Sequence, residues 1–154
     1  MTRPVIAVLN GANLNLLGER DPAAYGRATL ADVESLCRRT ADELGYDIDF
    51  RQTHHEGVLV EQLHEVRASA AGVVLNAAAH THTSVAVRDA AAVVKGPVIE
   101  VHLSNIHRRE PFRGHSFVSE VADGVVAGCG PHGYALALRQ VDHLVRASER
   151  TDER

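Results

Sequence analysis

Side chains that could do chemistry gather directly behind three short apolar runs of this chain. Behind residues 5–9 come Asn13, Asn15, Arg20 and Tyr25; behind residues 72–75 come Asn76, His80, His82, Thr83 and Ser84; behind residues 98–101 come His102, Ser104, Asn105, Arg108, Arg109 and Arg113. The set holds amides, imidazoles, hydroxyls and guanidinium groups, with few acids. Arginine pairs with carboxylates, whereas amides and imidazoles can bind hydroxyls. These residue types therefore indicate a small, polyhydroxylated, anionic substrate.

The apolar runs have the pattern of strands that are buried on both faces. Residues 5–9 (Val-Ile-Ala-Val-Leu) are continuously apolar and break at Asn10-Gly11, which is typical of a parallel sheet. Two further strands are predicted at residues 46–51 and 124–127. The loop over residues 11–27 is longer than most α/β connections, and such loops are usually functional or disordered.

Helices are predicted between the strands from their caps and their apolar spacing. Thr29 with Asp32 has the form of an N-terminal cap, and Gly45 ends that helix. A second helix is predicted over 56–71, a third from Thr83 or Ser84 through residue 94, and a last one over 134–147. The side chains expected to face inward are Val60, Leu63, His64 and Val66 in the second helix, and Val85, Val87, Ala90, Ala91 and Val94 in the third.

Strand and helix alternate throughout, which predicts an α/β fold with right-handed crossovers. Five strands favour a flavodoxin-like parallel sheet of order 2-1-3-4-5 with helices on both faces. We expect residues 1–147 to form a single domain and residues 148–154 to be a charged, frayed tail. In such sheets the site lies at the carboxyl ends of the strands, near the switch between strands 1 and 3.

Composition excludes several classes of protein. The 154 residues carry a formal charge of −4, which argues against a nucleic-acid binder, and no apolar run is long enough to span a membrane. The two cysteines, Cys37 and Cys129, form no CxxC motif, which argues against a disulfide scaffold or a zinc ribbon. The N-terminus turns polar too soon for a signal peptide, so we expect a cytoplasmic protein.

Three sharper alternatives are less consistent with the sequence. Residues 128–133 match the G-x-G-x-x-G dinucleotide motif, but no further strand follows and the required acidic residue would fall in the tail. A metal site at His80, His82 and His102 has no obvious carboxylate to complete it, so no metal is predicted. A receiver-type phosphoacceptor domain needs an aspartate where Asn76 ends its strand.

Five stretches of the chain resemble the type II 3-dehydroquinate dehydratases. They are residues 9–18 with Arg20 and Tyr25-Gly26, residues 75–79 with 81–86, residues 100–105, residues 109–116, and the glycine-rich turn that ends in Gly133-Tyr134. The motifs stand in the family's order over nearly the whole chain. The chain departs from the family at Ala12, where proline is usual, and at residues 77–79, where three alanines replace a motif that often holds Gly or Pro.

The resemblance implies the dehydration of 3-dehydroquinate to 3-dehydroshikimate in the shikimate pathway of aromatic amino acid biosynthesis, or in quinate breakdown. The reaction is an anti elimination through an enolate, with no cofactor and no imine. By likeness, Tyr25 as phenolate is the base and Arg20 is its cationic neighbour. Asn13, with a water, would stabilise the enolate, and His102 would be the general acid whose ring Glu100 orients.

The resemblance also implies how the substrate is held. Asn76 and the backbone amides of Leu103 and Ser104 would bind its carboxylate, while His82 and Arg113 would bind its ring hydroxyls. The loop over residues 11–27 would close over the substrate as a lid.

The family resemblance further implies a homo-oligomer, a dodecamer of trimers in which Asp89 reaches towards a neighbouring subunit's site. The sole lysine, Lys95, is predicted at a helix end away from the site, which fits the imine-free route. The alternative from another class is a flavodoxin-like binding module that uses the same pocket for a sugar acid or nucleotide without chemistry.

Overall fold

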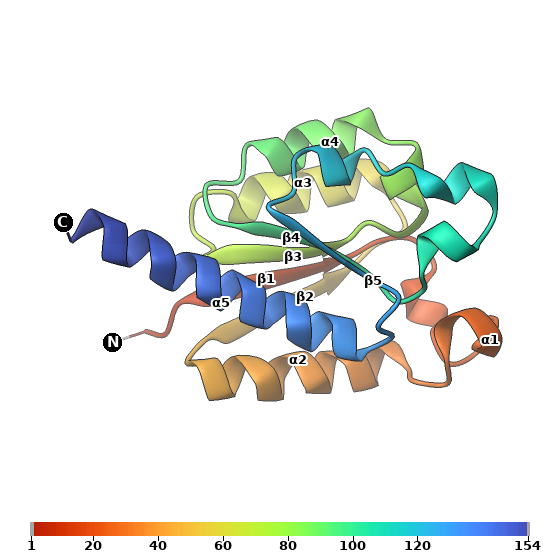
Figure 1. Cartoon of the computed structure of the whole chain (residues 1–154), viewed down its shortest axis with the longest axis horizontal. Helices are drawn as coiled ribbons and strands as arrows, with labels where there is room; N and C mark the ends of the chain where they lie inside the picture. The colour runs from red at the N-terminus through yellow and green to blue at the C-terminus, as the bar shows by residue number, and fades with distance from the viewer. Residues whose placement is uncertain (1, 154) are drawn as a thin grey trace.

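The computed structural model describes residues 2–153 and is built around a five-stranded parallel sheet (Figure 1). Its strands are β1 (Val5–Asn10), β2 (Asp47–Gln52), β3 (Gly72–Asn76), β4 (Val98–His102) and β5 (Gly124–Ala127). Their spatial order is β2-β1-β3-β4-β5, and all four pairings are parallel. The predicted flavodoxin-like order is confirmed. The three continuous apolar runs of the sequence form the central strands β1, β3 and β4, as expected for strands that are buried on both faces.

Helices cover both faces of the sheet. Helices α2 (Leu30–Leu44) and α5 (His132–Asp152) lie on one face, and α3 (Glu56–Val66) and α4 (Val85–Ala92) on the other (Figure 1). Alternate residues of β1 supply the two cores, since successive side chains of a strand point to opposite faces. Ile6 and Val8 face α2 and α5, whereas Ala7 and Leu9 face α3 and α4, and all four are fully buried.

The predicted caps are present. The Thr29 side chain accepts from the Asp32 amide and the Asp32 side chain accepts from the Thr29 amide, which forms a capping box at the start of α2. Gly45 ends that helix in the left-handed region, at φ 90°. Of the two candidate caps for α4, the structure selects Ser84, whose hydroxyl accepts from the Val87 amide at 2.9 Å.

The helix faces differ from the prediction at two side chains. His64 is exposed, because the buried face of α3 consists of Leu59, Leu63 and Val66 and the next residue along a helix points about 100° away. Val85 is 51% exposed, since it lies two positions before the buried Val87, and two steps of about 100° turn it to the opposite side of the helix.

The helix ends also differ from the prediction. α3 ends at residue 66 and α4 at residue 92, earlier than expected, while α5 continues past residue 147 to residue 152. In that extension Thr151 Oγ1 donates to the Ala147 carbonyl at 3.1 Å and Arg150 Nε to the Arg146 carbonyl at 3.2 Å. No helix among residues 2–153 is long and apolar enough to cross a membrane.

Three segments leave the carboxyl edge of the sheet and form one end of the molecule (Figure 1). The segment after β1 contains a 3₁₀ turn, η1 (Leu14–Leu16), and a short helix, α1 (Pro22–Tyr25), where a loop was predicted. The segment after β3 contains η2 (Ala78–His82), and the segment after β4 contains η3 (Ile106–Arg108), η4 (Pro111–Gly114) and η5 (Val118–Glu120). The first two segments meet at Gly11, where a Cβ would lie 2.4 Å from the Ala77 carbonyl oxygen, so only glycine fits there.

Candidate active site

A cavity of about 140 Å³ opens where these three segments meet. It is lined by nine of the predicted site residues, namely Asn13, Arg20, Tyr25, Asn76, His82, His102, Leu103, Ser104 and Arg113, and by Ala12, Leu14, Ala78, Ala79, Ile106 and Arg109. The structure therefore brings together residues that lie up to 100 positions apart in the sequence. Glu100 lies directly behind His102, whereas Asp89 lies elsewhere, on α4.

Asn13 enters the cavity from a strained backbone position. It has φ 67°, in the left-handed region that Asn tolerates better than most residues, and it begins η1. The backbone amide of Asn13 donates to His54 Nδ1 at 3.1 Å. The His54 carbonyl in turn accepts from His80 Nε2 at 3.0 Å, so η2 helps to fix the start of the predicted lid.

The Tyr25 phenol lies between two guanidinium groups. Arg109 Nη1 donates to Tyr25 Oη at 2.8 Å, and Arg20 Nη2 lies 3.4 Å from the same oxygen. The guanidinium carbons stand over the phenol ring, 5.1 Å from its centroid for Arg109 and 4.5 Å for Arg20. Arg109 also donates to Ser104 Oγ at 3.2 Å, so it links Tyr25, the last residue of α1, to the segment that follows β4. The phenol oxygen therefore has a guanidinium group on each of two sides.

Asn76 is held by a buried polar chain beneath the cavity. Its Nδ2 donates to Tyr134 Oη at 2.8 Å, and that hydroxyl donates to Asn10 Oδ1 at 2.7 Å. Asn76 Oδ1 accepts from the Ala78 amide at 3.1 Å, and Asn10 Nδ2 donates to the Arg51 carbonyl at 2.9 Å. Both amides therefore have fixed orientations, and β1, β3 and α5 are linked through one hydroxyl.

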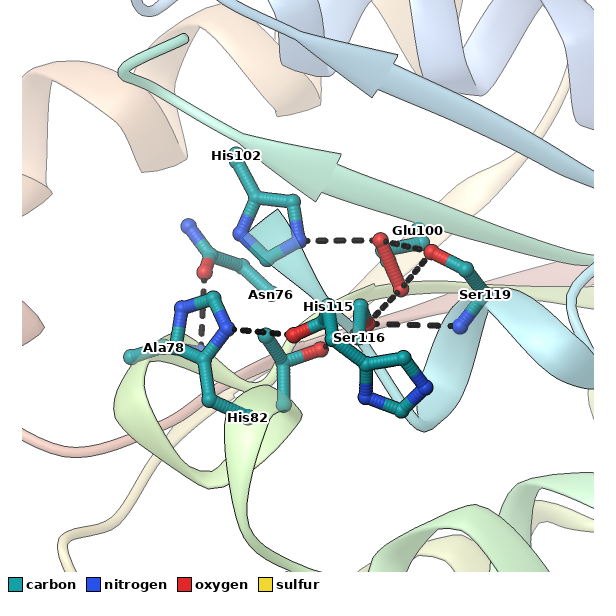
Figure 2. A network of polar contacts seen from close by, with 9 residues as sticks. Asn76, Ala78, His82, Glu100, His102, His115, Ser116 and Ser119 are labelled. Carbon is teal, nitrogen blue, oxygen red and sulfur yellow. Dashed lines mark hydrogen bonds and ion pairs between the residues drawn. The ribbon is translucent and has the colours of Figure 1, made fainter. Parts of the chain in front are cut away.

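His102 has its ring orientation set by Glu100 (Figure 2). The Nε2 atom lies 2.9 Å from Glu100 Oε2, and the two side chains are 6% and 0% exposed. Nδ1 consequently lies on the other side of the ring, towards Asn76 and His82 in Figure 2. Burial raises the pKa of Glu100, but the hydrogen bond and charge of His102, with two serine hydroxyls, outweigh it and keep the pKa below its usual value.

His82 stacks near His102 and is held in one tautomer. The ring centroids are 6.4 Å apart with an angle of 18° between the planes. Its Nδ1 lies 2.7 Å from the His115 carbonyl, which can only accept, so Nδ1 carries the hydrogen. Burial is the main cause that lowers the pKa of His82, and the charges of His102 and Arg113 add to it. The lowered pKa favours the neutral ring, and with the hydrogen on Nδ1 its Nε2 can accept a hydrogen bond.

Of the remaining predicted residues, Leu103, Ser104 and Arg113 line the cavity, whereas Asp89 lies outside it. Leu103 and Ser104 directly follow β4, so their backbone lies at the cavity wall. Arg113 lines the cavity from η4, and its Nε donates to Glu110 at 2.8 Å. Asp89 has a side chain that is 65% exposed and pairs with Arg88 at 2.9 Å, outside the cavity.

Two residues of the site were not among those selected from the sequence. Arg109 belonged to the polar group behind the fourth strand, but its spacing could not distinguish it from Arg108 or Arg113. Tyr134 ended one of the stretches that carry the resemblance but was given no role in the site, since an aromatic residue on an apolar helix face usually belongs to the core. What distinguishes Arg109 from the other two arginines is its hydrogen bond to Tyr25 Oη, which only the folded structure shows.

A lysine imine and a metal site both have less support in this geometry. Lys95 lies at the amino edge of the sheet, before β4, and lines a different cavity. Within residues 2–153, no three His, Cys, Asp or Glu side chains are grouped so that they could hold a metal ion. The cavity instead combines a phenol beside two cations with an imidazole beside a carboxylate, which are the parts of a base and an acid.

Comparisons with known proteins agree with this geometry. The family model described as dehydroquinase class II matches residues 4–142. Proteins named 3-dehydroquinate dehydratase from Methylobacterium radiotolerans and Streptomyces coelicolor are 58% and 56% identical to this chain; the alignments cover 90% and 92% of it and 93% and 91% of those proteins. The crystal structure of type II dehydroquinase from Propionibacterium acnes superposes with a TM-score of 0.87 at 41% identity, over 92% of this chain and 98% of that one. This chain belongs to the class II dehydroquinase family.

Proposed function

We propose that this chain is a 3-dehydroquinate dehydratase, which removes water from 3-dehydroquinate to give 3-dehydroshikimate. Its named relatives support the substrate, and the site supports the reaction type. The observation that carries the proposal is the Tyr25 phenol between Arg20 and Arg109, in the same cavity as His102. A binding module would have no need of a phenol flanked by two cations.

The first step removes a proton from the carbon beside the ketone. That proton is weakly acidic, so the step needs both a base and a group that stabilises the enolate oxygen. We assign the base to Tyr25 as phenolate, whose oxygen lies next to the guanidinium groups of Arg109 and Arg20. The C–H electron pair passes into the enolate, and Asn13, with a water, is assigned to the oxygen that becomes negative.

The second step expels the hydroxyl on the next carbon. The enolate electrons form the new C=C bond as the C–O bond breaks, and His102 supplies the proton with which the hydroxyl leaves as water. Because Glu100 accepts from Nε2, the proton would be delivered from Nδ1. The product is a conjugated enone, and the proton count is restored when Tyr25 returns its proton to His102 through solvent.

Substrate binding is assigned to the polar wall of the cavity. Asn76 and the amides of Leu103 and Ser104 would hold the carboxylate, which suits backbone N–H donors at the end of a strand. His82 and Arg113 would hold the ring hydroxyls. The neutral His82 ring offers Nε2 as an acceptor, so a substrate hydroxyl can donate to it.

We further propose a closing lid, a symmetrical assembly and a cytoplasmic location. The lid is residues 11–27, which carry Arg20 and Tyr25 and would exclude water on closing. The assembly is a dodecamer of trimers in which the exposed carboxylate of Asp89 reaches a neighbouring subunit's site. Light scattering of the purified protein tests the assembly, and a monomer would contradict it.

An absorbance assay tests the activity. Purified protein is mixed with 3-dehydroquinate, and the conjugated enone product is followed with and without borohydride pretreatment and a chelator. We expect turnover that survives both treatments, because Lys95 lies away from the site. Binding of the substrate without turnover by the folded protein would favour the binding module instead.

A further inference from the structure

The carboxylate of Glu100 is fully buried and is surrounded by donors (Figure 2). The Ser116 hydroxyl donates to Oε1 at 2.7 Å, and the Ser119 hydroxyl lies 2.7 Å from Oε2 and 3.0 Å from Oε1. His102 Nε2 is the third donor, at 2.9 Å. A buried charge without partners is strongly unfavourable, so these donors decide whether the carboxylate can stay ionised.

The hydroxyl groups of Thr81 and Ser116 both donate in the direction of Glu100. Ser116 has a single hydroxyl hydrogen, which it donates to Glu100. The 2.6 Å contact between Ser116 Oγ and Thr81 Oγ1 is therefore a hydrogen bond from Thr81. Thr81 is fully buried, and its carbonyl accepts from the Phe117 amide at 2.8 Å. The segment that carries both serines is thus fixed against η2.

The two serines lie behind His102 and not at the substrate. Glu100, Ser116 and Ser119 are outside the set of described residues that line the cavity, whereas His102 is within it. The serines can therefore affect the reaction only through Glu100 and the imidazole that Glu100 orients. Ser119 is an exposed residue, so its hydroxyl serves little purpose in packing.

We propose that Ser116 and Ser119 are positioning residues for the proton donor His102. This inference rests on the proposed function, in which His102 Nδ1 delivers a proton to the departing hydroxyl. The two hydroxyls hold the Glu100 carboxylate in one orientation, which keeps Nε2–H directed at Oε2 and Nδ1 on the cavity side. Without them the carboxylate can rotate, and the ring loses its fixed direction.

The same hydroxyls affect the ionisation of Glu100. Burial raises its pKa, and the hydrogen bonds from His102, Ser116 and Ser119 lower it. Removing two of these donors leaves the burial in place, so the pKa of Glu100 rises in the variants. Because the ionised carboxylate is needed to accept from Nε2, the acid limb of the kcat profile moves to higher pH.

The elements around the Glu100 site, η2, η4, η5 and α4, also carry charged or titratable groups. The charges of Glu100 and of Arg113, which lies on η4, both act on the ring of His82 in η2. Arg88 of α4 pairs with Glu120 of η5 at 3.6 Å, where both side chains are partly exposed. The serine variants leave these groups in place, so a moved acid limb reports on Glu100.

The test compares kcat, KM and the pH profile of kcat for 3-dehydroquinate in matched variants. Ser119→Ala should lower kcat by about 10-fold with KM within about twofold of wild type, and Ser116→Ala with Ser119→Ala should lower kcat further. Ser119→Thr keeps the hydroxyl and should restore both kcat and the acid limb. Ser69→Ala changes an exposed serine in the turn after α3 and should match wild type.

Three results would overturn the inference. One is a wild-type kcat and an unmoved acid limb in Ser119→Ala. Another is an equal loss in Ser119→Thr, which would show that the side chain's shape matters and its hydroxyl does not. A wild-type protein without turnover would overturn the proposed function and, with it, the role assigned to the serines.

Discussion

Tyr25 differs from the other two tyrosines in what surrounds its hydroxyl. Burial raises the pKa of Tyr46 to about 12, and its hydroxyl donates to Asp142. Burial also raises the pKa of Tyr134, whose hydroxyl donates to Asn10. Tyr25 instead receives hydrogen bonds or close contacts from two guanidinium groups. At the scale of single residues, this arrangement is what singles out one phenol as a base.

The shorter contact to Tyr25 predicts that Arg109 contributes to turnover. A hydrogen bond to a charged group is worth about 1.5–3 kcal/mol, so Arg109→Ala should lower kcat by roughly 10- to 100-fold. Steady-state kinetics with 3-dehydroquinate measures this. Arg108→Ala is the matched control, because Arg108 lines an outer surface depression and not the cavity. A full kcat in Arg109→Ala would contradict the assignment.

Ala78 is held in the left-handed region at φ 52°, beside Asn76. A residue with a Cβ is disfavoured there by roughly 1–2 kcal/mol, so Ala78→Gly should raise the free energy of unfolding by about 1 kcal/mol. Urea unfolding measures the change. Ala79→Gly is the control, and it should destabilise by roughly 0.5–1 kcal/mol. Equal destabilisation by both glycines would contradict the strain at residue 78.

At the scale of elements, the Tyr134 hydroxyl joins β1, β3 and α5. Tyr134→Phe leaves Asn10 Oδ1 and Asn76 Nδ2 without this partner in a buried place, so we expect the free energy of unfolding to fall by about 1–3 kcal/mol. Urea unfolding measures the loss. Tyr46→Phe, whose partner Asp142 is partly exposed, should lose less. A larger loss in Tyr46→Phe would contradict the central role of this hydroxyl.

Much of the fold was predictable because its signals are local. The Thr29 cap and the Gly45 ending depend on residues within one helix, and the continuous apolar run at residues 5–9 fixes a central strand. The short helix α1 was missed, since its four residues are too few for a helical period. Val85 was misplaced because an apolar residue at a helix start can lie on the exposed side.

The site was predictable in composition but not in its contacts. Strand ends gave Asn76 and His102, because parallel strands deliver their carboxyl ends to one edge. The pairing of Arg109 with Tyr25 joins residues 84 positions apart, and no spacing rule covers such a contact. The donors to Glu100 were hidden for the same reason, since Ser116 and Ser119 come from a segment without regular structure in the sequence pattern.

At the scale of the whole molecule, sheet order decides which residues meet. The order β2-β1-β3-β4-β5 places β1, β3 and β4 side by side, so the three polar segments share one cavity. The positions of the cavity residues therefore depend on the apolar cores on both faces of the sheet. A probe of global unfolding should therefore also show when the site is lost.

Cys37 is such a probe. Burial raises its pKa to about 12, and Glu34 adds to this, so little reactive thiolate forms in the folded chain. A thiol reagent at neutral pH should modify only the exposed Cys129 in native protein and both thiols in urea. Counting modified thiols by mass spectrometry measures this. Rapid native labelling of Cys37 in a Cys129→Ser variant would contradict the packing of α2.

The most direct test of the account is the Tyr25→Phe variant, with binding and turnover measured separately. The substitution removes one oxygen and leaves the ring under both guanidinium groups. We predict that calorimetry shows 3-dehydroquinate binding close to that of wild type, while the enone assay shows kcat lower by about 1,000-fold or more. A Tyr25→Phe enzyme that keeps the wild-type kcat would contradict the claim that this phenol is the base.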